Sequence, residues 1–554
     1  MRWSNLKSIT LVFLALSTAT SSMIYELLVA QLIAHFTNQL ITWQCISIGI
    51  YLGGLGLGAW RSERIEKQSF QKFFLLETHL SLLGALLITF ICGLNIIYRT
   101  FIFQPLQSED GGILFFALIA QVFNFLISYW AGMEIPLIAS MWKLLPARSS
   151  LTTTQSTAFI LGLSYFGAFC GSILFSLWLF PQFHYAKTAM IVSFFNFISG
   201  FIFLVTFRPP IQWKTMIYFT AVGLVINLMI SISKKTYEYS VQNYYYGMRL
   251  TTYKAIPILI DRVLNSPPVQ QIITPVQTID LVFSNSLIDS NFPNHQSEVR
   301  PYHLYMDQRL QHSSMNEYTY HETMVHVPLQ LHGRIPQKVL VLGAGDGLLI
   351  RELLKYPEIK EIILVEIDKD FIDLAQTYSL FYKLNKNSLH NPKVKIIVGD
   401  AYYFTRSTNE KFDAIFADFP WPFQYDLAKL YSKEFYLQLN KILSTNGFLI
   451  LDFPILDSIK SFEKYVDIMR STLKSANFKQ TLIMDLNKES FIFAQAEDSK
   501  LNFSYQKLSF DITILIEQNL KELNNVYLQQ KEPVGSLVNS IFKPIILNIS
   551  DPRF

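Results

Sequence analysis

The sequence is poor in cysteine, and this scarcity argues against two kinds of cross-linked structure. Cys45, Cys92 and Cys170 lie far apart in the 554-residue chain, and no two of them have the short spacing of paired metal ligands. Such a set provides neither a disulfide framework nor a zinc site. We therefore expect no bound metal ion.

Charged residues are also scarce in the first part of the chain. Residues 1–235 contain 14 Lys and Arg and 7 Asp and Glu, which leaves 32 and 35 of the totals of 46 and 42 for the remainder. The second part is therefore slightly acidic. Neither part is basic enough to suggest binding to nucleic acid, so we expect no nucleic-acid partner.

What the first part contains instead is long apolar runs. We count seven, and each reaches or exceeds about 20 residues, the length of a helix that crosses a bilayer. A cleaved signal peptide is not expected, because its apolar core is only about 7 to 15 residues long and six further runs follow. The sequence thus predicts a polytopic α-helical membrane domain at residues 1–235, with spans at 8–36, 40–60, 74–98, 113–142, 156–181, 186–207 and 213–233.

A glycine-rich turn near the middle of the chain predicts a cofactor site. Residues 339–342 have the pattern of a buried strand, residues 343–347 contain three glycines, and residues 348–356 keep helical spacing. Gly343, Gly345 and Gly347 allow the backbone to approach a ligand closely. The second strand ends at Glu366, about twenty positions later, where a carboxylate accepts hydrogen bonds from ribose hydroxyls. Leu348 occupies the third glycine position of an NAD site, so the G-x-G-x-G form favours an S-adenosyl ligand.

Two further strands end in acidic residues. Residues 394–398 lead to Gly399-Asp400, and residues 412–417 lead to Asp418. Ligands of open α/β sheets bind at these carboxyl ends. Asp346 in the glycine-rich turn has a second interpretation, since a short polar residue there can also cap the following helix.

Several separated motifs resemble the spermidine synthase (polyamine aminopropyltransferase) family. They are Thr274-Pro-Val-Gln277, Leu304-Tyr-Met-Asp307, Gln311, Asn316-Glu-Tyr-Thr-Tyr-His-Glu322 and Leu430-Tyr-Ser-Lys-Glu-Phe-Tyr436. With its apolar first part, the chain is similar to the membrane-embedded branch of that family. The resemblance implies a small β-rich element within residues 236–335, a Rossmann-like transferase domain at 336–500 and an extension of unknown role at 501–554. It also implies a possible homodimer.

The resemblance further implies a role for each candidate site residue. The expected co-substrate is decarboxylated S-adenosylmethionine. It is held by the three turn glycines, five polar residues and the residue after Asp400: Gln277, His321, Gly343, Gly345, Asp346, Gly347, Glu366, Asp400 and Ala401. Gln311, Tyr320 and Asp418 face the acceptor amine. A protonated amine must lose a proton before it attacks carbon, and a carboxylate can accept that proton. Asp418 is the candidate base, and Tyr320 orients the amine.

The chain departs from the family on the acceptor side. Trp421 replaces a second aspartate three residues after Asp418, and Asn316 stands where the family has aspartate. Trp421 could bind an ammonium group through its ring face, or it could indicate a more apolar acceptor. We keep two alternatives to aminopropyl transfer to a polyamine: a methyltransferase that uses intact S-adenosylmethionine on an apolar acceptor, and a transporter or sensor that binds its ligand without catalysis.

Three glutamates lie inside the apolar runs, namely Glu26, Glu77 and Glu134. A carboxylate is expensive to bury in lipid, so each should face a helix interface or a cavity. Either they hydrogen-bond between helices and fix packing, or the membrane domain receives or passes a polyamine cation. Three glycines of the second run are interpreted as close helix packing: Gly54, Gly56 and Gly58.

The charges of the loops and the supply of the co-substrate predict opposite orientations. Ten basic residues lie on the N-terminal side, namely Arg2, Lys7, Arg61, Arg64, Lys67, Lys72, Lys143, Arg148, Arg208 and Lys214, against Arg99 and Lys187 opposite. The positive-inside rule then puts the N-terminus in the cytoplasm, and seven crossings put the transferase domain outside. We expect an integral protein of the bacterial inner membrane with a cytoplasmic transferase domain. This requires a re-entrant or hidden segment, or an exception to the charge rule.

Overall fold

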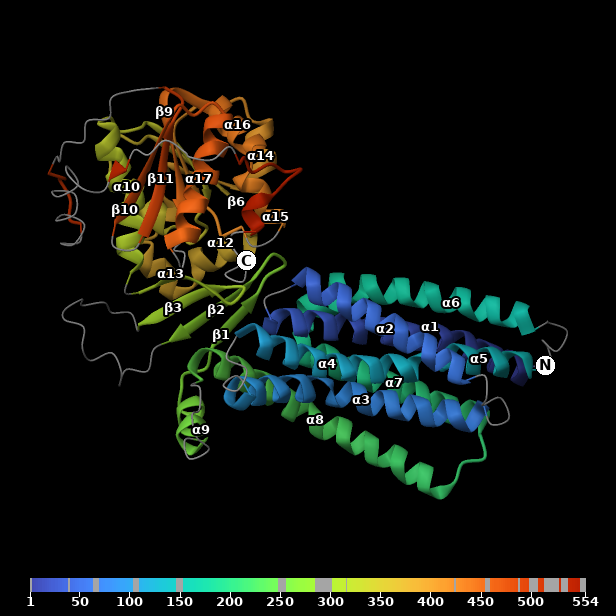
Figure 1. The fold of residues 1–554 in the computed structure, drawn as a ribbon. Coiled ribbons are helices and arrows are strands. Elements are labelled where there is room, and N and C mark those ends of the chain that lie inside the picture. Colours follow the sequence, from blue (N-terminus) through green and yellow to red (C-terminus); the bar gives the residue numbers. More distant parts are fainter. Residues whose placement is uncertain are drawn as a thin grey trace. The chain divides into compact units, whose positions relative to one another are not determined.

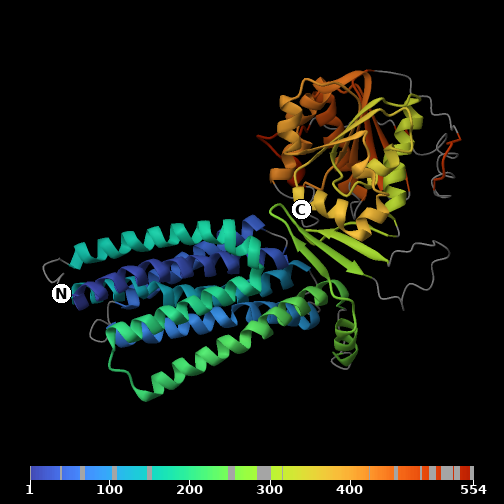
Figure 2. The same ribbon diagram turned by 180° about the vertical axis from the view of Figure 1, so that it is seen from behind.

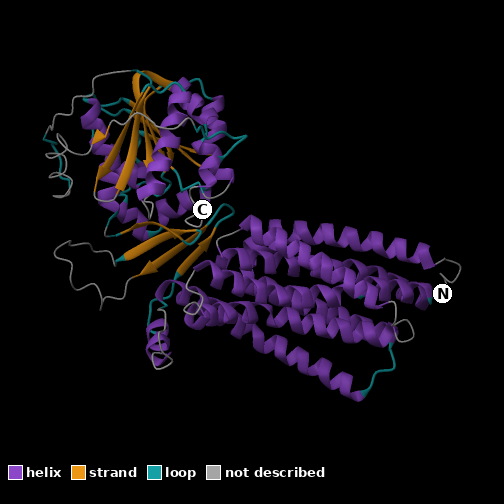
Figure 3. Ribbon diagram, in the orientation of Figure 1, coloured by secondary structure: helices purple, strands orange, loops and turns teal. Residues whose placement is uncertain are grey.

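The structure, a computed structural model, divides into two compact units. The first comprises Met1–Ile273 and Ile279–Ser290, and the second comprises Thr274–Thr278 and Asn291–Phe554. Figure 3 shows that the first is mainly helical, whereas the second combines strands and helices. The described residues are 2–37, 40–62, 69–102, 109–145, 153–247, 256–283, 301–314, 316–422, 425–453, 459–486, 489–497, 507–512, 528–529 and 537–548.

The first unit is a bundle of long apolar helices that lie side by side (Figures 1 and 2). Six helical stretches are long and apolar enough to cross a membrane. The helices are α1 (Arg2–Thr37), α2 (Leu40–Ser62), α3 (Ser69–Ile97), α4 (Glu109–Gly132), α5 (Glu134–Lys143), α6 (Thr153–Leu174), α7 (Phe180–Phe207) and α8 (Trp213–Tyr246), with π-helical turns η2 (Tyr98–Ile102) and η4 (Phe175–Leu179).

The longest stretch, Thr154–Phe207, is two helices rather than one. Helical geometry breaks at His184, whose φ of 53° lies in the left-handed region, and α6 and α7 both pack against α1. The described bundle therefore has seven long helical segments, counting α4 and α5 as one, which correspond to the seven predicted apolar runs. Because seven is odd, α8 ends at the opposite end of the bundle from the start of α1 (Figure 1). No re-entrant helix lies among the described residues, so the conflict over orientation remains.

The break between α4 and α5 follows from a proline. Pro136 has no backbone N–H, and its ring clashes with the carbonyl four residues earlier, which is that of Gly132. The α-helix accordingly stops at Gly132 and resumes at Glu134. Glu134 thus lies in the first helical turn of α5, where the unpaired N–H groups of the helix favour a carboxylate.

Two of the three glycines in α2 lie where another helix approaches closely. A Cβ atom built on Gly58 would lie 2.0 Å from the carbonyl oxygen of Tyr129, and one on Gly54 would lie 1.9 Å from Ser128 Oγ. Gly56 has no such neighbour within 4 Å. The close-packing prediction is confirmed for Gly54 and Gly58, which form one face of α2, and is wrong for Gly56, which points away from α4.

The predicted boundary at residue 235 falls inside α8, which continues to Tyr246. The tyrosines after that boundary hold the next strands. Tyr237 donates a 2.6 Å hydrogen bond to Gln271, and Tyr245 donates one of 2.6 Å to Asp280. The first unit therefore also includes α9 (Ile256–Leu264), β1 (Gln270–Ile273) and most of its neighbour β2 (Thr278–Phe283).

The second unit contains an eight-stranded sheet with helices on both faces. Its strand order is β12-β10-β11-β9-β8-β5-β6-β7, and β5 through β9 run parallel. The strands are β5 (Lys338–Gly343), β6 (Glu361–Glu366), β7 (Val394–Val398), β8 (Phe412–Asp418), β9 (Leu443–Phe453), β10 (Gln480–Leu486), β11 (Glu489–Gln495) and β12 (Leu528–Gln529). Strand order reverses between β5 and β8, which is where open α/β sheets bind ligands.

Two sets of helices bury the two faces of this sheet. An apolar core joins α16 (Lys433–Ile442) and α17 (Ile459–Ser475) to one face, whereas α10 (Glu317–His332) packs against β9 and β11. The other helices are α11 (Leu348–Leu353), α12 (Lys369–Thr377), α13 (Ser379–Leu384), η6 (Ser388–His390), α14 (Ala401–Ser407), α15 (Tyr425–Ala428), η7 (Lys429–Tyr431) and η8 (Ile545–Asn548), and an antiparallel pair, β3 (Tyr302–Met306) and β4 (Arg309–Ser313), precedes α10.

The described part of the C-terminal extension belongs to this second unit. Asn539 donates a 2.8 Å hydrogen bond to the carbonyl of Tyr431, and Ile546 is fully buried in the α16–α17 core. The extension therefore has a structural role in the fold.

Candidate active site

The switch point of the sheet brings the glycine-rich turn beside Asp418. Gly343 ends β5 and is the register partner of Asp418, which ends β8. Gly343 has a φ of 81°, and a Cβ atom there would lie 2.0 Å from the carbonyl oxygen of Asp418. Glycine is therefore required at this position both by the backbone conformation and by the neighbouring strand.

The same turn brings its backbone against Glu366 at the end of β6. A Cβ atom on Gly345 would lie 2.9 Å from Glu366 Cγ. Glu366 is 8% exposed, and its Oε1 accepts a 2.9 Å hydrogen bond from the backbone N–H of Asp368. Burial raises the pKa of Glu366 to about 7. This carboxylate ends a strand at the edge where open α/β sheets bind their ligands, and its ribose role stays a prediction.

Gln277 reaches this end of the sheet through Asp368, a residue that sequence reasoning missed. The Asp368 Oδ2 atom accepts hydrogen bonds from Gln277 Nε2, at 3.0 Å, and from the Thr274 hydroxyl, at 2.7 Å. Its Oδ1 atom caps α12 by accepting the N–H of Phe371. The pattern of a short polar residue before a helix, two positions after Glu366, was a signal that could have identified it.

Asp346 makes the helix-start contact of one predicted interpretation, while its adenosyl role stays a prediction. Its Oδ1 accepts the N–H of Leu348 at 3.0 Å, as a helix cap does, while Oδ2 lies 3.4 Å from His312 Nε2. Burial raises the pKa of Asp346, but His312 and His321 outweigh burial and hold it below its ordinary value. The sequence motifs did not identify His312, although it directly follows the motif residue Gln311.

Tyr320 and Asp418 form a direct contact on the α10 face of the sheet. The Tyr320 hydroxyl donates a 2.8 Å hydrogen bond to Asp418 Oδ1. Burial raises the pKa of Asp418, against an opposing effect of His321, and Asp346 acts in the same direction as burial. A carboxylate with a raised pKa and a fixed hydroxyl partner is suited to accept a proton.

His321 is buried beside this pair and is held by its own helix. Its Nδ1 lies 2.6 Å from the carbonyl oxygen of Glu317. Burial lowers the pKa of His321, but Glu317 and Asp346 outweigh burial, so the pKa is raised above its ordinary value. Glu317 in turn accepts two hydrogen bonds from Arg351 on α11, at 3.1 and 2.9 Å. This buried ion pair fixes α10, and therefore Tyr320, against the helix that follows the glycine-rich turn.

Two further carboxylates lie around Tyr320, and sequence reasoning assigned a role to neither. In the register that pairs Ala417 with Leu451, Asp452 is the next residue on β9 beside Asp418, and it pairs across with Phe491 of β11. The Phe491 ring lies 5.2 Å from that of Tyr320, and Asp418, Asp452 and Glu489 all raise the pKa of Tyr320 after burial, which is the largest cause.

Glu489 shares this face because it is two residues from Phe491 on the same strand. It accepts a 3.4 Å hydrogen bond from the Asn316 amide, and burial raises its pKa to about 7. Three neighbouring strands thus each contribute a carboxylate to the surroundings of Tyr320. The register of β9 and β11 was needed to see this arrangement.

Two predicted acceptor residues have other contacts in the structure. Gln311 donates a 3.3 Å hydrogen bond to the carbonyl of Arg309, and its neighbour His312, on the opposite side of the strand, is the one that reaches Asp346. The Trp421 indole stacks on the buried ring of Tyr465, with 5.0 Å between centroids and 28° between planes. One face of Trp421 is therefore occupied by the core of the unit.

Asp400 caps a helix and carries an ion pair. Its Oδ1 accepts the N–H of Tyr402 at 2.7 Å, and its Oδ2 lies 2.7 Å from Lys429 Nζ. Burial raises the pKa of Asp400, but Lys429 and the capping bond outweigh burial and lower it. Ala401 is the first residue of α14. The predicted adenosyl role of these two residues remains a prediction.

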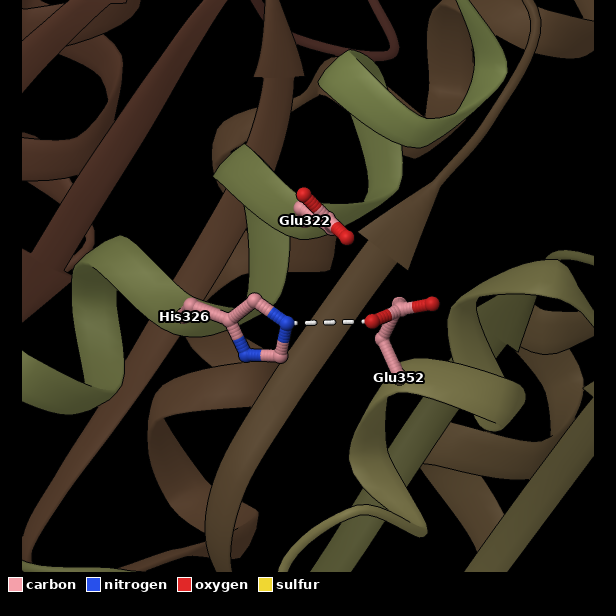
Figure 4. A group of neighbouring side chains, drawn as sticks. All are labelled: Glu322, His326 and Glu352. Atoms are coloured by element: carbon pink, nitrogen blue, oxygen red, sulfur yellow. Dashed lines mark hydrogen bonds and ion pairs between the residues drawn. The ribbon is translucent and has the colours of Figure 1, made fainter. Parts of the chain in front are cut away.

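One group of side chains has the composition of a metal site but is neutralised by basic residues. Glu322 and His326 of α10 and Glu352 of α11 point toward one another (Figure 4), and His326 Nε2 lies 3.0 Å from Glu352 Oε2. Arg351 Nε lies 2.7 Å and Lys355 Nζ 2.5 Å from Glu352. The cluster is therefore best described as an ion-pair network between α10 and α11.

Comparison with known proteins gives consistent matches. Residues 317–506 match the family model of the spermine/spermidine synthase domain. The chain is 28% identical over 431 residues to the polyamine aminopropyltransferase of Leptospira interrogans, which covers 78% of this chain and 76% of that protein. It is 37% identical over 159 residues to polyamine aminopropyltransferase 2 of Bacillus cereus, or 28% and 43% of the two chains. The crystal structure of spermidine synthase from Thermotoga maritima aligns with 22% identity over 46% of this chain and 88% of that one, with a TM-score of 0.35.

Proposed function

Because the chain belongs to the spermidine synthase family, we propose that it is a polyamine aminopropyltransferase. It transfers the aminopropyl group of decarboxylated S-adenosylmethionine to putrescine or a related amine and releases methylthioadenosine. The observation that carries this proposal is the hydrogen bond from Tyr320 to Asp418 at the switch point, directly beside the glycine-rich turn. The names of the relatives, polyamine aminopropyltransferases from several bacteria, support it.

The proposed reaction gives Asp418 the role of general base. The acceptor nitrogen attacks the carbon next to the sulfonium, so that a C–N bond forms as the C–S bond breaks, and the proton leaves the nitrogen for Asp418. Tyr320 keeps the Asp418 carboxylate in one orientation through its 2.8 Å hydrogen bond. General-base catalysis of this kind contributes about 10²- to 10⁴-fold to the rate.

The co-substrate is assigned to the other side of the turn. Glu366 accepts the ribose hydroxyls, the glycines admit the adenosyl group, and Gln277 is kept nearby by Asp368. Asp346, whose pKa is held low by His312 and His321, supplies negative charge toward the cationic sulfonium. Two cationic reactants among fixed carboxylates are positioned without reorganisation at the moment of reaction.

The acceptor side is assigned to Asp452 and Glu489 in addition to Asp418. These two carboxylates provide the negative charge that is missing at Trp421 and Asn316. A second carboxylate anchor favours an acceptor with two ammonium groups, one beside Asp418 and one farther along β9 and β11. For the alternative methyltransferase, one face of the Trp421 ring is already covered by Tyr465, which leaves the other face for an apolar acceptor.

The decisive experiment is a product assay on the detergent-purified chain. Incubation with putrescine and decarboxylated S-adenosylmethionine is expected to give methylthioadenosine and spermidine by mass spectrometry. S-adenosylhomocysteine from intact S-adenosylmethionine would instead identify a methyltransferase. If ligand binds and neither product forms, the chain is a transporter or sensor rather than an enzyme.

We further propose that the first unit spans the bacterial inner membrane, with the second unit in the cytoplasm, where its co-substrate is made. The support is the length and apolarity of the helices and the requirement for an adenosyl co-substrate. The ten basic loop residues of the N-terminal side then lie outside, against the usual charge rule. Fusion of green fluorescent protein or alkaline phosphatase to the C-terminus tests this: fluorescence without phosphatase activity is expected, and phosphatase activity contradicts it.

A further inference from the structure

A group of buried acidic and hydroxyl side chains lies inside the helical bundle of the first unit. Glu77 on α3 is 0% exposed, and neither of its carboxylate oxygens has a hydrogen-bond partner among the described residues. Glu134, at the start of α5, is 3% exposed and interacts electrostatically with Glu77. Tyr25 of α1 interacts with both glutamates. Two carboxylates and a phenol therefore share one enclosed region of the bundle.

Hydroxyl groups of α1 line the same region. Thr18 hydrogen-bonds Glu134, and Tyr25 lies two turns farther along α1. Ser21 lies between these two on the same helix face, because residues three and four apart are neighbours on a helix. Ser21 is 1% exposed, and its hydroxyl has no hydrogen-bond partner among the described residues. This is a second buried polar group that lacks a partner.

Glycines on two helices let these side chains pack directly against the neighbouring backbone. Gly84 lies two turns after Glu77 on α3, and a Cβ atom there would lie 2.1 Å from the Tyr25 hydroxyl oxygen. Gly200 of α7 faces Glu77, and a Cβ atom there would lie 3.4 Å from Glu77 Cβ. The region is thus bounded by α1, α3, α5 and α7, with glycine where the acidic and phenolic side chains approach the neighbouring backbone.

Helix packing alone does not explain Glu77. A carboxylate retained for packing would accept hydrogen bonds from the adjacent helix, since a buried polar group without a partner is unfavourable by about 1–3 kcal/mol and more if charged. Among the described ion pairs, none joins a basic side chain to Glu77 or Glu134. A bound cation would supply the missing donors and the missing charge.

The donor set favours an organic ammonium over a metal ion. In the described part of the chain, three side chains lie close enough together to hold a metal ion, namely Glu322, His326 and Glu352, and they belong to the second unit. The bundle offers two carboxylates and hydroxyl oxygens instead. A primary ammonium has three N–H donors, which match Glu77, Glu134 and Ser21.

We propose that Glu77, Glu134, Ser21 and Tyr25 form a binding site for a protonated aliphatic amine inside the helical unit. This site is separate from the acceptor site of the second unit and does not depend on catalysis there. α4 ends at Gly132, and Glu134 lies in the first turn of α5, where the N–H groups of a helix favour a carboxylate. In membrane transporters, discontinuous helices of this kind form the walls of substrate sites.

The test is the number of amines bound per chain. Equilibrium dialysis of the full chain in detergent, with radiolabelled spermidine and without co-substrate, is expected to detect two sites. In the double variant Glu77→Gln/Glu134→Gln, affinity at one of them should fall about 10- to 100-fold, the effect of losing charge-assisted hydrogen bonds. Glu238→Gln is the control, because Glu238 is a glutamate of the same unit whose side chain is 54% exposed; it should retain both sites.

Two outcomes would exclude this binding site. Equal stoichiometry and affinity in the double variant and the parent chain, or displacement of the second spermidine by an equal concentration of sodium, would remove it. Size-exclusion chromatography and the methylthioadenosine assay on the same samples show whether the second unit is folded and active. If the double variant does not fold, Glu77→Gln and the charge-retaining Glu77→Asp decide, since the first should lose the site and the second should keep it.

Discussion

Tyr320 donates its hydroxyl hydrogen to Asp418 Oδ1 at 2.8 Å, and this contact joins α10 to the carboxyl end of β8. If Asp418 is the base, Asp418→Asn should lower the turnover number by about 10²- to 10⁴-fold while the co-substrate still binds. Tyr320→Phe removes a hydrogen bond to a charged group and should lower it by about 10-fold. Steady-state rates and calorimetric titration with methylthioadenosine measure both effects. Full turnover by Asp418→Asn would eliminate Asp418 as the base.

The pH dependence of stability should reveal Glu366. Its pKa is raised to about 7 by burial, above the value of about 4.3 in an unfolded chain. The folded state therefore favours the protonated form, and this stabilisation is complete below about pH 4.3 and is lost as pH rises through about 7. Relative to wild type, Glu366→Gln should thus become more stable between pH 5 and pH 8, by up to about 3 kcal/mol, in chemical denaturation.

The same variant should bind the co-substrate more weakly at high pH, where the ionised carboxylate accepts the ribose hydroxyls. Glu358→Gln, at an exposed position of the same unit, is the control and should change neither property. A pH-independent difference between Glu366→Gln and wild type would contradict the assigned ionisation.

Glu489 should act on the acceptor and not on the co-substrate. Glu489→Gln removes the charge that faces Tyr320 and Asn316, so the KM for putrescine should rise about 10-fold while the KM for decarboxylated S-adenosylmethionine stays within twofold. Asp452→Asn should behave in the same way. Equal changes in both KM values would indicate a general disturbance of the fold rather than an acceptor anchor.

Trp421 should matter for stability more than for acceptor binding. Its ring stacks on Tyr465 at the edge of the α16–α17 core, so Trp421→Ala should reduce the free energy of unfolding by roughly 3 kcal/mol. Trp421→Phe keeps an aromatic ring against Tyr465 and should lose less. If the acceptor instead binds the indole, Trp421→Phe will raise the KM for putrescine severalfold, which would favour the cation–π interpretation.

The glycines of α2 provide an internal comparison for the bundle. Gly58→Ala places a methyl group against the backbone of Tyr129 and should lower the free energy of unfolding by about 1–3 kcal/mol, as overpacking does. Gly56→Ala meets no atom within 4 Å and should be neutral or slightly stabilising. Thermal unfolding in detergent measures both. Equal melting temperatures would mean that α2 and α4 are not packed as described.

The strands and the glycine-rich turn were predictable because local pattern determines them. The predicted strands at 394–398 and 412–417 correspond to β7 and β8, and the acidic residues that end β6 and β8 were recognised from position alone. The seven apolar runs likewise correspond to seven long helical segments of the described bundle, because length and apolarity can be read from the sequence alone. The end of α8 was misplaced because Tyr237 and Tyr245 are held by residues of β1 and β2 farther along the chain.

Apart from Asp368, the site residues that sequence reasoning missed depend on tertiary pairing. Asp452 and Glu489 meet Tyr320 only through the antiparallel register of β9 and β11. His312 could be distinguished from Gln311 only by the face of β4 that turns toward Asp346. The stacking of Trp421 on Tyr465 could not be predicted, because Tyr465 lies in a helix that the sequence does not connect with it.

Asp368 connects the start of α12 to Gln277, so the two are expected to open together. One of its carboxylate oxygens holds the first turn of α12 and the other holds Gln277, 91 positions away in the sequence. The Phe371 amide hydrogen cannot exchange with solvent unless its bond to the Asp368 carboxylate breaks, and movement of that carboxylate also releases Gln277. The exchange rate of the Phe371 amide should therefore report, in the absence of any reaction, how often this side of the site opens.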